Sequence, residues 1–245
     1  MNVLRTLIFF LMLAIGTVIW GTLCLSLFFL PFRLRFRLAR CWNKFVVWLA
    51  KVVCGIRYQT KGMDALPDAP LILLSKHQSA WETFFFFCWA LRPPTFVLKR
   101  ELLRIPFFGW VLALLRMIPI DRANNTQAFR RVIAHGKHRL ANGHWIFVFP
   151  EGTRTQPGTA GKYSRSGARL AIETHTPVIP VALNSGMCWP KDSLIKKPGL
   201  ITVSFGAPIL PDGKTPDDLM QEVEDWIEAE IRRFPFASSV TEKVS

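Results

Sequence analysis

The fold is decided by residues 71–82, LILLSKHQSAWE, in which an apolar run passes through a short polar loop into the start of a helix. The large apolar residues Leu71 to Leu74 predict a strand. Ser79, followed three residues later by Glu82, is the pattern of a capping box, in which each side chain binds an exposed amide of the first helical turn. A strand that leads directly into a helix is the repeating unit of an α/β domain.

The rest of the chain continues this alternation. Short apolar runs bounded by proline, glycine or charge predict further strands at Phe96–Leu98, Trp145–Phe149, Val178–Leu183 and Ile201–Phe205. Helices are predicted at Trp81–Leu91, Phe107–Leu115, Thr126–Ala141 and Ser166–Thr174. A last helix is expected to begin at Thr215 as N-cap, with Pro216 in the first helical position. Residues 58–245 are therefore expected to form one α/β domain with a mixed central sheet flanked by helices.

The composition combines a surplus of apolar residues with an excess of positive charge. Of the 245 residues half are hydrophobic, 20 are Phe and 9 are Trp, and the formal net charge is +14. Apolar and aromatic residues in this quantity indicate that part of the chain faces lipid. The positive charge attracts polyanions, and both nucleic acid and an anionic membrane meet that description. Composition alone does not choose between nucleic acid and membrane, but the positions of the charges along the chain do.

The N-terminal region points to a membrane. The 27 residues Thr6–Phe32 contain no charge. A helix of that length reaches about 40 Å, whereas the hydrocarbon core of a bilayer is about 30 Å thick. A secretory signal peptide has a shorter apolar region and a small-residue cleavage site, so we interpret the segment as a retained anchor. The basic residues that follow it place the remainder of the chain in the cytoplasm by the positive-inside rule. They are Arg33, Arg35, Arg37, Arg40 and Lys44.

A second, amphipathic helix is predicted over Ala39–Val53, where tryptophan and aliphatic residues recur at helical spacing. A basic, Trp-rich helix suits a membrane interface, so residues 1–57 are expected to form a membrane anchor. The two helices either cross the bilayer or form a hairpin within one leaflet. Burial of the hairpin in a soluble core is disfavoured, because the uncharged run is long for a globular helix. Nucleic acid is excluded as a partner, because the densest cationic run follows an apolar span instead of forming a stripe with interleaved aromatic residues.

The loop before the predicted helix at residue 81 carries a candidate catalytic pair. If Ser79 caps the helix, Glu82 occupies its third position, and His77 in the loop can meet that carboxylate. A carboxylate of this kind fixes the tautomer of an imidazole and stabilises its protonated form. His77 would then take the proton from an attacking hydroxyl, a contribution of about 10²–10⁴-fold to the rate. The same residues also satisfy a plain capping box that needs no chemistry.

A second motif, Pro150-Glu151-Gly152-Thr153-Arg154, follows a predicted strand, at the strand end where α/β proteins place ligand sites. Gly152 lets the backbone approach a ligand closely. Arg154 offers a planar fork that suits two phosphate oxygens at once. The isolated pentapeptide is equally compatible with an ordinary turn and a solvated arginine. Further cations in the neighbouring loops are Lys99, Arg100, Arg122, Lys162 and Arg165.

The cysteines and histidines show no metal-binding pattern. The five cysteines are scattered and none forms a C-x-x-C pair, which indicates reduced packing residues. His135, His138 and His144 have no thiol or carboxylate close in sequence, and we interpret them as surface histidines. Neither a metal nor a cofactor is expected.

Together these blocks resemble the 1-acylglycerol-3-phosphate acyltransferase family, also called lysophosphatidic acid acyltransferases. The resemblance covers about Gly62 to Pro208, in the family's order. Its H-x₄-D/E box matches His77 to Glu82, with Glu where Asp is commoner. The other matching blocks are Lys99 to Leu102 with Ile105 to Gly109, Ile118 to Arg122, Phe149 to Arg154, and Val178 to Val181.

The resemblance implies an O-acyltransferase of phospholipid biosynthesis. Such an enzyme moves a fatty acyl group from acyl-CoA or acyl-carrier protein to the 2-hydroxyl of 1-acylglycerol 3-phosphate, forming phosphatidic acid. It implies that His77 is the base, that Glu82 orients it, and that Lys99 and Arg154 hold the phosphate. The other residues implied to shape the acceptor pocket are Arg122, Glu151, Gly152 and Thr153.

The cellular location and the alternative reactions can also be stated as expectations. The expected location is the bacterial inner membrane, with the catalytic domain on its cytoplasmic side and in contact with anionic lipid. Another lyso-lipid, such as a lyso-ornithine lipid or a lysophospholipid with a head group, is the alternative acceptor. Thioester hydrolysis is disfavoured, because no residue pattern positions a water in place of the acceptor.

Overall fold

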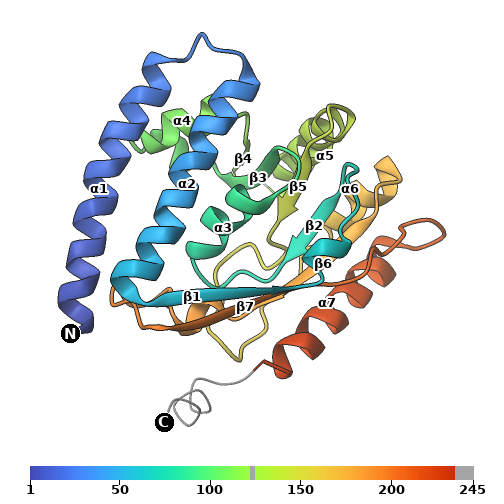
Figure 1. The fold of residues 1–245 in the computed structure, drawn as a ribbon. Helices are drawn as coiled ribbons and strands as arrows, with labels where there is room; N and C mark the ends of the chain where they lie inside the picture. Colours follow the sequence, from blue (N-terminus) through green and yellow to red (C-terminus); the bar gives the residue numbers. More distant parts are fainter. Residues whose placement is uncertain (122–124, 235–245) are drawn as a thin grey trace.

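Seven strands form one mixed sheet in the computed structural model, which describes residues 1–121 and 125–234. Their order across the sheet is β1-β7-β6-β2-β5-β3-β4 (Figure 1). The strands are β1 (Ile56–Lys61), β2 (Ile72–Ser75), β3 (Pro94–Lys99), β4 (Ile118–Ile120), β5 (Trp145–Val148), β6 (Val178–Leu183) and β7 (Gly199–Phe205). Neighbouring strands are parallel, except that β6 and β7 are antiparallel. The expected α/β class with a mixed sheet is confirmed.

The central strands β2, β5 and β6 are buried at every residue. Successive side chains of a strand point to opposite faces of the sheet. Accordingly, Leu71 and Leu73 join one hydrophobic core, whereas Ile72 and Leu74 join the core on the other face. Parallel strands that are covered on both faces read as continuous apolar runs. This burial on both sides explains why residues 71–74 show no polar alternation.

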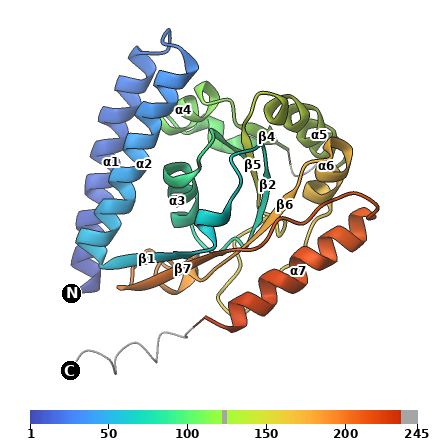
Figure 2. The ribbon, with the colours of Figure 1, turned by 45° about the vertical axis from the view of Figure 1, so that its right-hand side comes forward.

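Helices cover both faces of the sheet (Figures 1 and 2). On one face lie α2 (Phe32–Cys54) and α3 (Trp81–Trp89), and on the other lie α5 (Asn125–Ala141), α6 (Ser166–Thr174) and α7 (Pro216–Arg232). The remaining helices are α1 (Asn2–Ser26), which runs beside α2, and the short α4 (Phe108–Leu114). Three 3₁₀ turns are η1 (Met63–Ala65), η2 (Arg100–Arg104) and η3 (Ser185–Met187). Thr215 caps α7 as expected and forms a capping box with Asp218.

The N-terminal boundaries differ from the expectation. The uncharged run is divided, because α1 ends at Ser26 and a turn precedes Pro31, the N-cap of α2. The second helix therefore begins at Phe32 and not at Ala39, so the basic run belongs to it. Strands β1 and β4 were not anticipated. Strand β1 is an edge strand whose sequence is largely polar, and β4 has only three residues.

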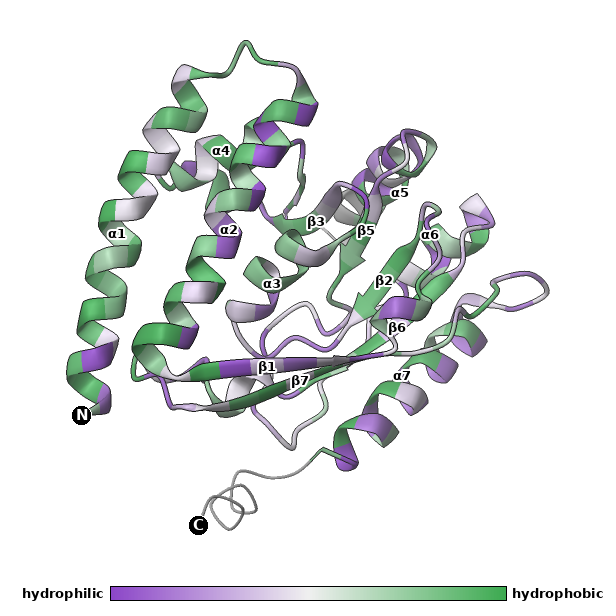
Figure 3. Cartoon of the chain, in the orientation of Figure 1, coloured by the Kyte–Doolittle hydropathy of each residue, from purple (hydrophilic) through white to green (hydrophobic). Residues whose placement is uncertain are grey.

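Among the described helices, α1 alone is long and apolar enough to cross a membrane. Only 17% of its most apolar window is buried inside the molecule. Figure 3 shows apolar residues along most of its length. Its exposed apolar residues include a stripe formed by Leu4, Leu7, Leu11, Ile15 and Val18. An exposed stripe of this kind fits contact with lipid, so the helix supports membrane association of the chain.

Helix α1 is nevertheless docked on the rest of the molecule at both ends. Near its N-terminus, the hydroxyl oxygen of Thr6 accepts a hydrogen bond of 2.9 Å from the backbone N–H of Lys196. Near its C-terminus, a Cβ added to Gly21 would lie 2.7 Å from the Cβ of Phe107, just before α4. The helix is therefore fixed to the α/β domain near both of its ends, and the division of the chain at residue 57 stays a prediction.

The glycine that ends the Ile105–Gly109 block is required by close packing. A Cβ at Gly109 would lie 2.4 Å from the carbonyl oxygen of Leu102 and 2.5 Å from that of Leu103. We expect Gly109→Ala to push α4 away from η2 and to lower the free energy of unfolding by about 1–3 kcal/mol. Thermal unfolding of the detergent-solubilised protein measures the loss. An unchanged Tm would show that α4 and η2 separate without cost.

Candidate active site

His77 and Glu82 meet across the loop between β2 and α3. The Nδ1 atom of His77 lies 2.9 Å from Oε1 of Glu82. The imidazole stacks on the ring of Phe149, with the ring centroids 4.0 Å apart, and 16% of the His77 side chain is exposed. The carboxylate and the aromatic ring thus hold the imidazole in one orientation while a ligand can still reach it.

The buried carboxylate of Glu82 accepts hydrogen bonds from five donors. Besides His77, the donors are the backbone N–H groups of Gln78 and Ser79, both 2.8 Å from Oε1, and the hydroxyls of Ser79 and Ser185 on Oε2. Burial raises the pKa of Glu82, but the interactions with His77, Ser185 and Ser79 outweigh it and hold the pKa below its ordinary value. The ionised carboxylate accepts a hydrogen bond from the Nδ1–H of His77, which leaves Nε2 as the nitrogen with a free lone pair.

The start of α3 differs from the predicted capping box. The N-cap residue is Ala80, so Glu82 stands at the second helical position and not the third. The hydroxyl of Ser79 donates to the Glu82 carboxylate and accepts from the backbone N–H of Trp81 at 3.0 Å. Because the buried carboxylate of Glu82 requires hydrogen-bond donors from the loop, the Ser79 hydroxyl and the loop amides bind Glu82, and the predicted capping box does not form.

The second motif comes to the same place because it follows β5, which is parallel to β2. Gly152 has φ +66°, in the left-handed region that favours glycine. Beyond this turn, Thr153 and Arg154 line a cavity of about 570 Å³ together with His77 and Lys99. The structure therefore brings the candidate base and the two predicted phosphate-binding cations to one cavity.

The walls of this cavity come from both the N-terminal helices and the α/β domain. They are mostly apolar and include Trp20 and Gly21 of α1, Trp42 of α2, Phe84 and Phe87 of α3, Phe96 of β3 and Val111 of α4. A concave, largely apolar site with a few polar groups suits a ligand with a hydrocarbon chain and a charged head. The N-terminal helices, of which α1 supports membrane association, are thus part of the site as well.

Glu151 does not line the cavity. Its Oε2 accepts from the backbone N–H of His77 at 3.1 Å, and its Oε1 accepts from that of Gly161 at 2.9 Å. Its Oε1 also pairs with Nζ of Lys76 at 2.8 Å. Glu151 therefore joins the loop that carries His77 to the loop that carries Arg154, and its place in the site is a positioning one.

Lys76 belongs to this arrangement although the sequence reasoning did not single it out. It is 1% exposed, and its Nζ also pairs with Glu228 of α7 at 2.7 Å. The hydroxyl of Tyr163 donates to the same Glu228 oxygen at 2.8 Å. A lysine is almost never fully buried unless it is paired. Its position beside His77 was visible in the sequence, but its partner Glu228 stands 152 residues away.

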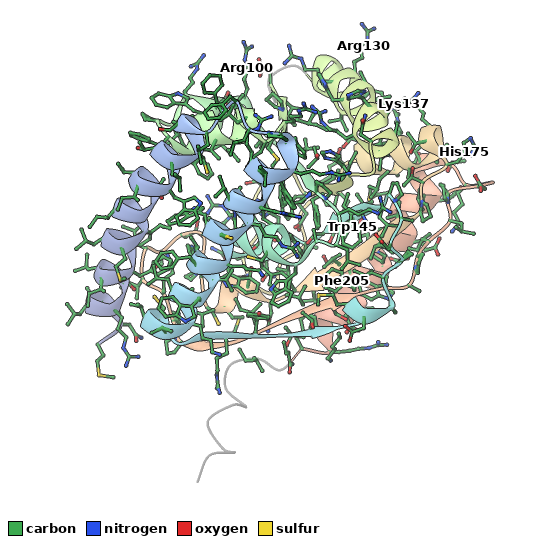
Figure 4. The ribbon with its side chains drawn as sticks, turned by 45° about the horizontal axis from the view of Figure 1, so that its top comes forward. Arg100, Arg130, Lys137, Trp145, His175 and Phe205 are labelled. Atoms are coloured by element: carbon green, nitrogen blue, oxygen red, sulfur yellow. The ribbon has the colours of Figure 1, made fainter. Side chains whose placement is uncertain are left out.

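Three of the other predicted cations, Arg100, Lys162 and Arg165, are not among the residues that line the cavity. Among the described residues, the cations that line the cavity are Lys99 and Arg154. Arg122 lies outside the described residues. Arg165 pairs with Asp217 at the start of α7, and Lys162 and Arg100 are exposed, Arg100 at the periphery of the molecule in Figure 4.

The part of the chain that the structure describes holds no group of three His, Cys, Asp or Glu residues that could bind a metal ion. His135 and His138 are exposed as expected, but His144 is buried and hydrogen-bonded to Thr95 at 2.9 Å. Burial, together with the nearby charges of Arg139 and Arg116, lowers the pKa of His144 to about 4. All five cysteines are free, and four of them are buried.

Comparison with known proteins gives one consistent result. A family model described as Acyltransferase matches residues 57–184. The chain is 44% identical over 232 residues to a 1-acyl-sn-glycerol-3-phosphate acyltransferase of Pseudomonas aeruginosa, covering 91% of this chain and 89% of that protein. It is 26% identical to a protein of the same name from Limnanthes douglasii, covering 92% and 80%. The fold matches the crystal structure of a 1-acyl-sn-glycerophosphate acyltransferase from Thermotoga maritima with a TM-score of 0.79 at 23% identity, covering 96% and 98% of the two chains.

Removal of the buried lysine should be costly. Lys76→Met leaves Glu151 as a buried carboxylate without its cation, and we expect the free energy of unfolding to fall by about 3–5 kcal/mol. Chemical unfolding in detergent measures this loss. The matched control is Lys214→Met, which removes the exposed pair with Glu222 and should cost less than about 1 kcal/mol. Equal losses in the two variants would contradict the role given to the buried pair.

Proposed function

Because this chain belongs to the Acyltransferase family and is an O-acyltransferase of the 1-acylglycerol-3-phosphate type, we propose that it acylates the 2-hydroxyl of 1-acylglycerol 3-phosphate to form phosphatidic acid. The family resemblance seen in the sequence is thereby confirmed. The observation that carries the proposal is the His77–Glu82 pair at 2.9 Å, placed on an apolar cavity that Lys99 and Arg154 also line. The acyl donor in the proposal is acyl-CoA or acyl-carrier protein.

The pair supports a general-base mechanism. In the proposed reaction, Nε2 of His77 takes the proton from the glycerol 2-hydroxyl while its oxygen attacks the thioester carbonyl. The new ester bond forms as the carbon–sulfur bond breaks, and the thiolate leaves with the electron pair. The imidazolium, stabilised by the ionised Glu82, then returns its proton to the thiolate. All of these steps proceed without a metal or a resident cofactor.

The two cations of the cavity suit the phosphate of the acceptor. The guanidinium of Arg154 can bind two phosphate oxygens at once, and the ammonium of Lys99 adds a second positive charge. Gly152 and Thr153 line the cavity between Arg154 and the strand and complete the acceptor pocket in our proposal. The part proposed for Arg122 rests on the sequence alone.

The cavity also suggests how the lipid is held. Because α1 and α2 supply part of its apolar wall, a hydrocarbon chain in the cavity contacts the helices that face the membrane. Docking of both ends of α1 on the α/β domain favours a hairpin within one leaflet over a full span. We place this hairpin in the bacterial inner membrane, with the arginines of α2 and the catalytic domain on the cytoplasmic side.

The head group of the acceptor can be tested directly. Purified enzyme with acyl-CoA, and separately with acyl-carrier protein, is assayed against lysophosphatidic acid, a lysophospholipid with a larger head group and a lyso-ornithine lipid. We expect the highest kcat/KM with lysophosphatidic acid. Arg154→Ala should raise KM for this acceptor about 10-fold or more, the loss of one charged hydrogen-bonding partner. Preference for another lyso-lipid, or release of free fatty acid at the full rate, would overturn the proposal.

The catalytic pair has its own test. We expect Glu82→Gln to lower kcat about 10²-fold or more with little change in KM, because the amide fills the same space but cannot stabilise the imidazolium. His77→Ala should lower kcat at least as far. Circular dichroism and membrane association should stay unchanged in both variants. Undiminished turnover by Glu82→Gln would reduce Glu82 to a structural residue of the loop.

A further inference from the structure

The loop from Trp189 to Pro198, between η3 and β7, displays two adjacent apolar side chains in water. Leu194 is 76% exposed and Ile195 is 39% exposed. Lys191 and Lys197 flank them and are also exposed. Large apolar residues left in water forgo about 25 cal/mol for each Å² that could be buried. Two of them side by side, bordered by lysines, have the composition of a membrane-interface segment.

Lys196, which follows Ile195, fixes the conformation of this loop. Lys196 turns inward and is almost completely buried. Its backbone N–H donates to Thr6 of α1 at 2.9 Å, and its Nζ donates to the carbonyl oxygen of Leu194 at 2.7 Å. The same ammonium lies 4.8 Å from the ring centroid of Phe10 and 4.7 Å from that of Trp189. With Lys196 held between these rings, the neighbouring Leu194 and Ile195 remain on the outside.

These contacts attach the loop to the inner side of the helix whose outer side carries the exposed apolar stripe. Thr6 is buried and Phe10 packs against the core, whereas Leu4, Leu7 and Leu11 in the same turns of α1 are exposed. The loop is also joined to the active site, since Asp192 accepts a hydrogen bond of 2.8 Å from Gln156, two residues beyond Arg154. It therefore bridges the lipid-facing helix and the loop that carries a cavity cation.

We propose that Leu194 and Ile195 form a second membrane contact of this protein, inserting into the interfacial layer that α1 occupies while Lys191 and Lys197 bind anionic head groups. Apolar insertion and lysine attraction act together at an anionic surface. The contact holds the Arg154 loop at the level of the lipid head groups. It depends on lipid contact by α1 and not on the catalytic roles of any residue.

A site-specific fluorophore tests the proposal. Cys41 is the exposed cysteine, so Cys41→Ser provides a background in which the four remaining cysteines are buried. An environment-sensitive NBD label is placed by Leu194→Cys, or, as the control, by Gln221→Cys on the exposed side of α7. Both proteins are reconstituted into vesicles of phosphatidylethanolamine and phosphatidylglycerol.

We expect the label at position 194 to emit further to the blue, to lose most of its quenching by aqueous iodide and to be quenched by lipids that carry a shallow nitroxide. The label at position 221 should show the opposite behaviour. A label at 194 that iodide quenches as fully as the control, in protein shown to float with the vesicles, would overturn the proposal. Because this measurement needs no turnover, its failure is distinct from a failure of the proposed reaction.

A functional readout complements the label. The variant with Leu194→Ser and Ile195→Ser should lose several-fold in kcat/KM for an acceptor embedded in vesicles and keep its kcat/KM for a short-chain acceptor dispersed in water. An equal loss for both acceptors would point to a damaged active site instead of a lost membrane contact. No loss for either acceptor would show that Leu194 and Ile195 make no membrane contact that matters for activity. Either result would contradict the proposal.

Discussion

A carboxylate that is taken completely out of water has to be supplied with hydrogen-bond donors, and this requirement organises the centre of the molecule. Glu82 has no exposed surface, and an unpaired ion in such a place costs several kcal/mol. Its donors come from the backbone of the β2–α3 loop, from His77 and from Ser185 in η3. Because all of them must converge on two oxygens, the loop has one conformation and the imidazole has one orientation.

A second buried carboxylate, that of Glu151, fixes the loop that carries Arg154 against the loop that carries His77. Glu151 accepts from the backbone of His77 and pairs with Lys76, which is held in turn by Glu228 of α7. The two loops are therefore positioned relative to each other by charged groups that do not line the cavity. These ionic groups hold the loops that carry His77 and Arg154, and they connect both loops to α7 on the other face of the sheet.

The N-terminal helices serve two purposes because of where they pack. Trp20, Gly21 and Trp42 face the cavity, whereas the apolar stripe of α1 faces outward. In the proposed function, these helices would let a hydrocarbon chain move between lipid and the cavity with little exposure to water, which the hydrophobic effect disfavours. The N-terminal segment was expected only as an anchor, since amphipathicity shows that a helix has two sides but not which partner each side contacts.

By itself, the sequence determined the α/β class, the central strands and the candidate pair His77 and Glu82, because continuous apolar runs and an H-x₄-E spacing are local patterns that short-range geometry converts directly into structure. Only the tertiary structure decided the edge strand β1, the partners of Lys76 and Glu151, and the union of α1 and α2 with the cavity. These features depend on groups far apart in the chain, such as Lys76 and Glu228 at a separation of 152 residues. Their meeting follows from strand order and helix packing, which no local pattern records.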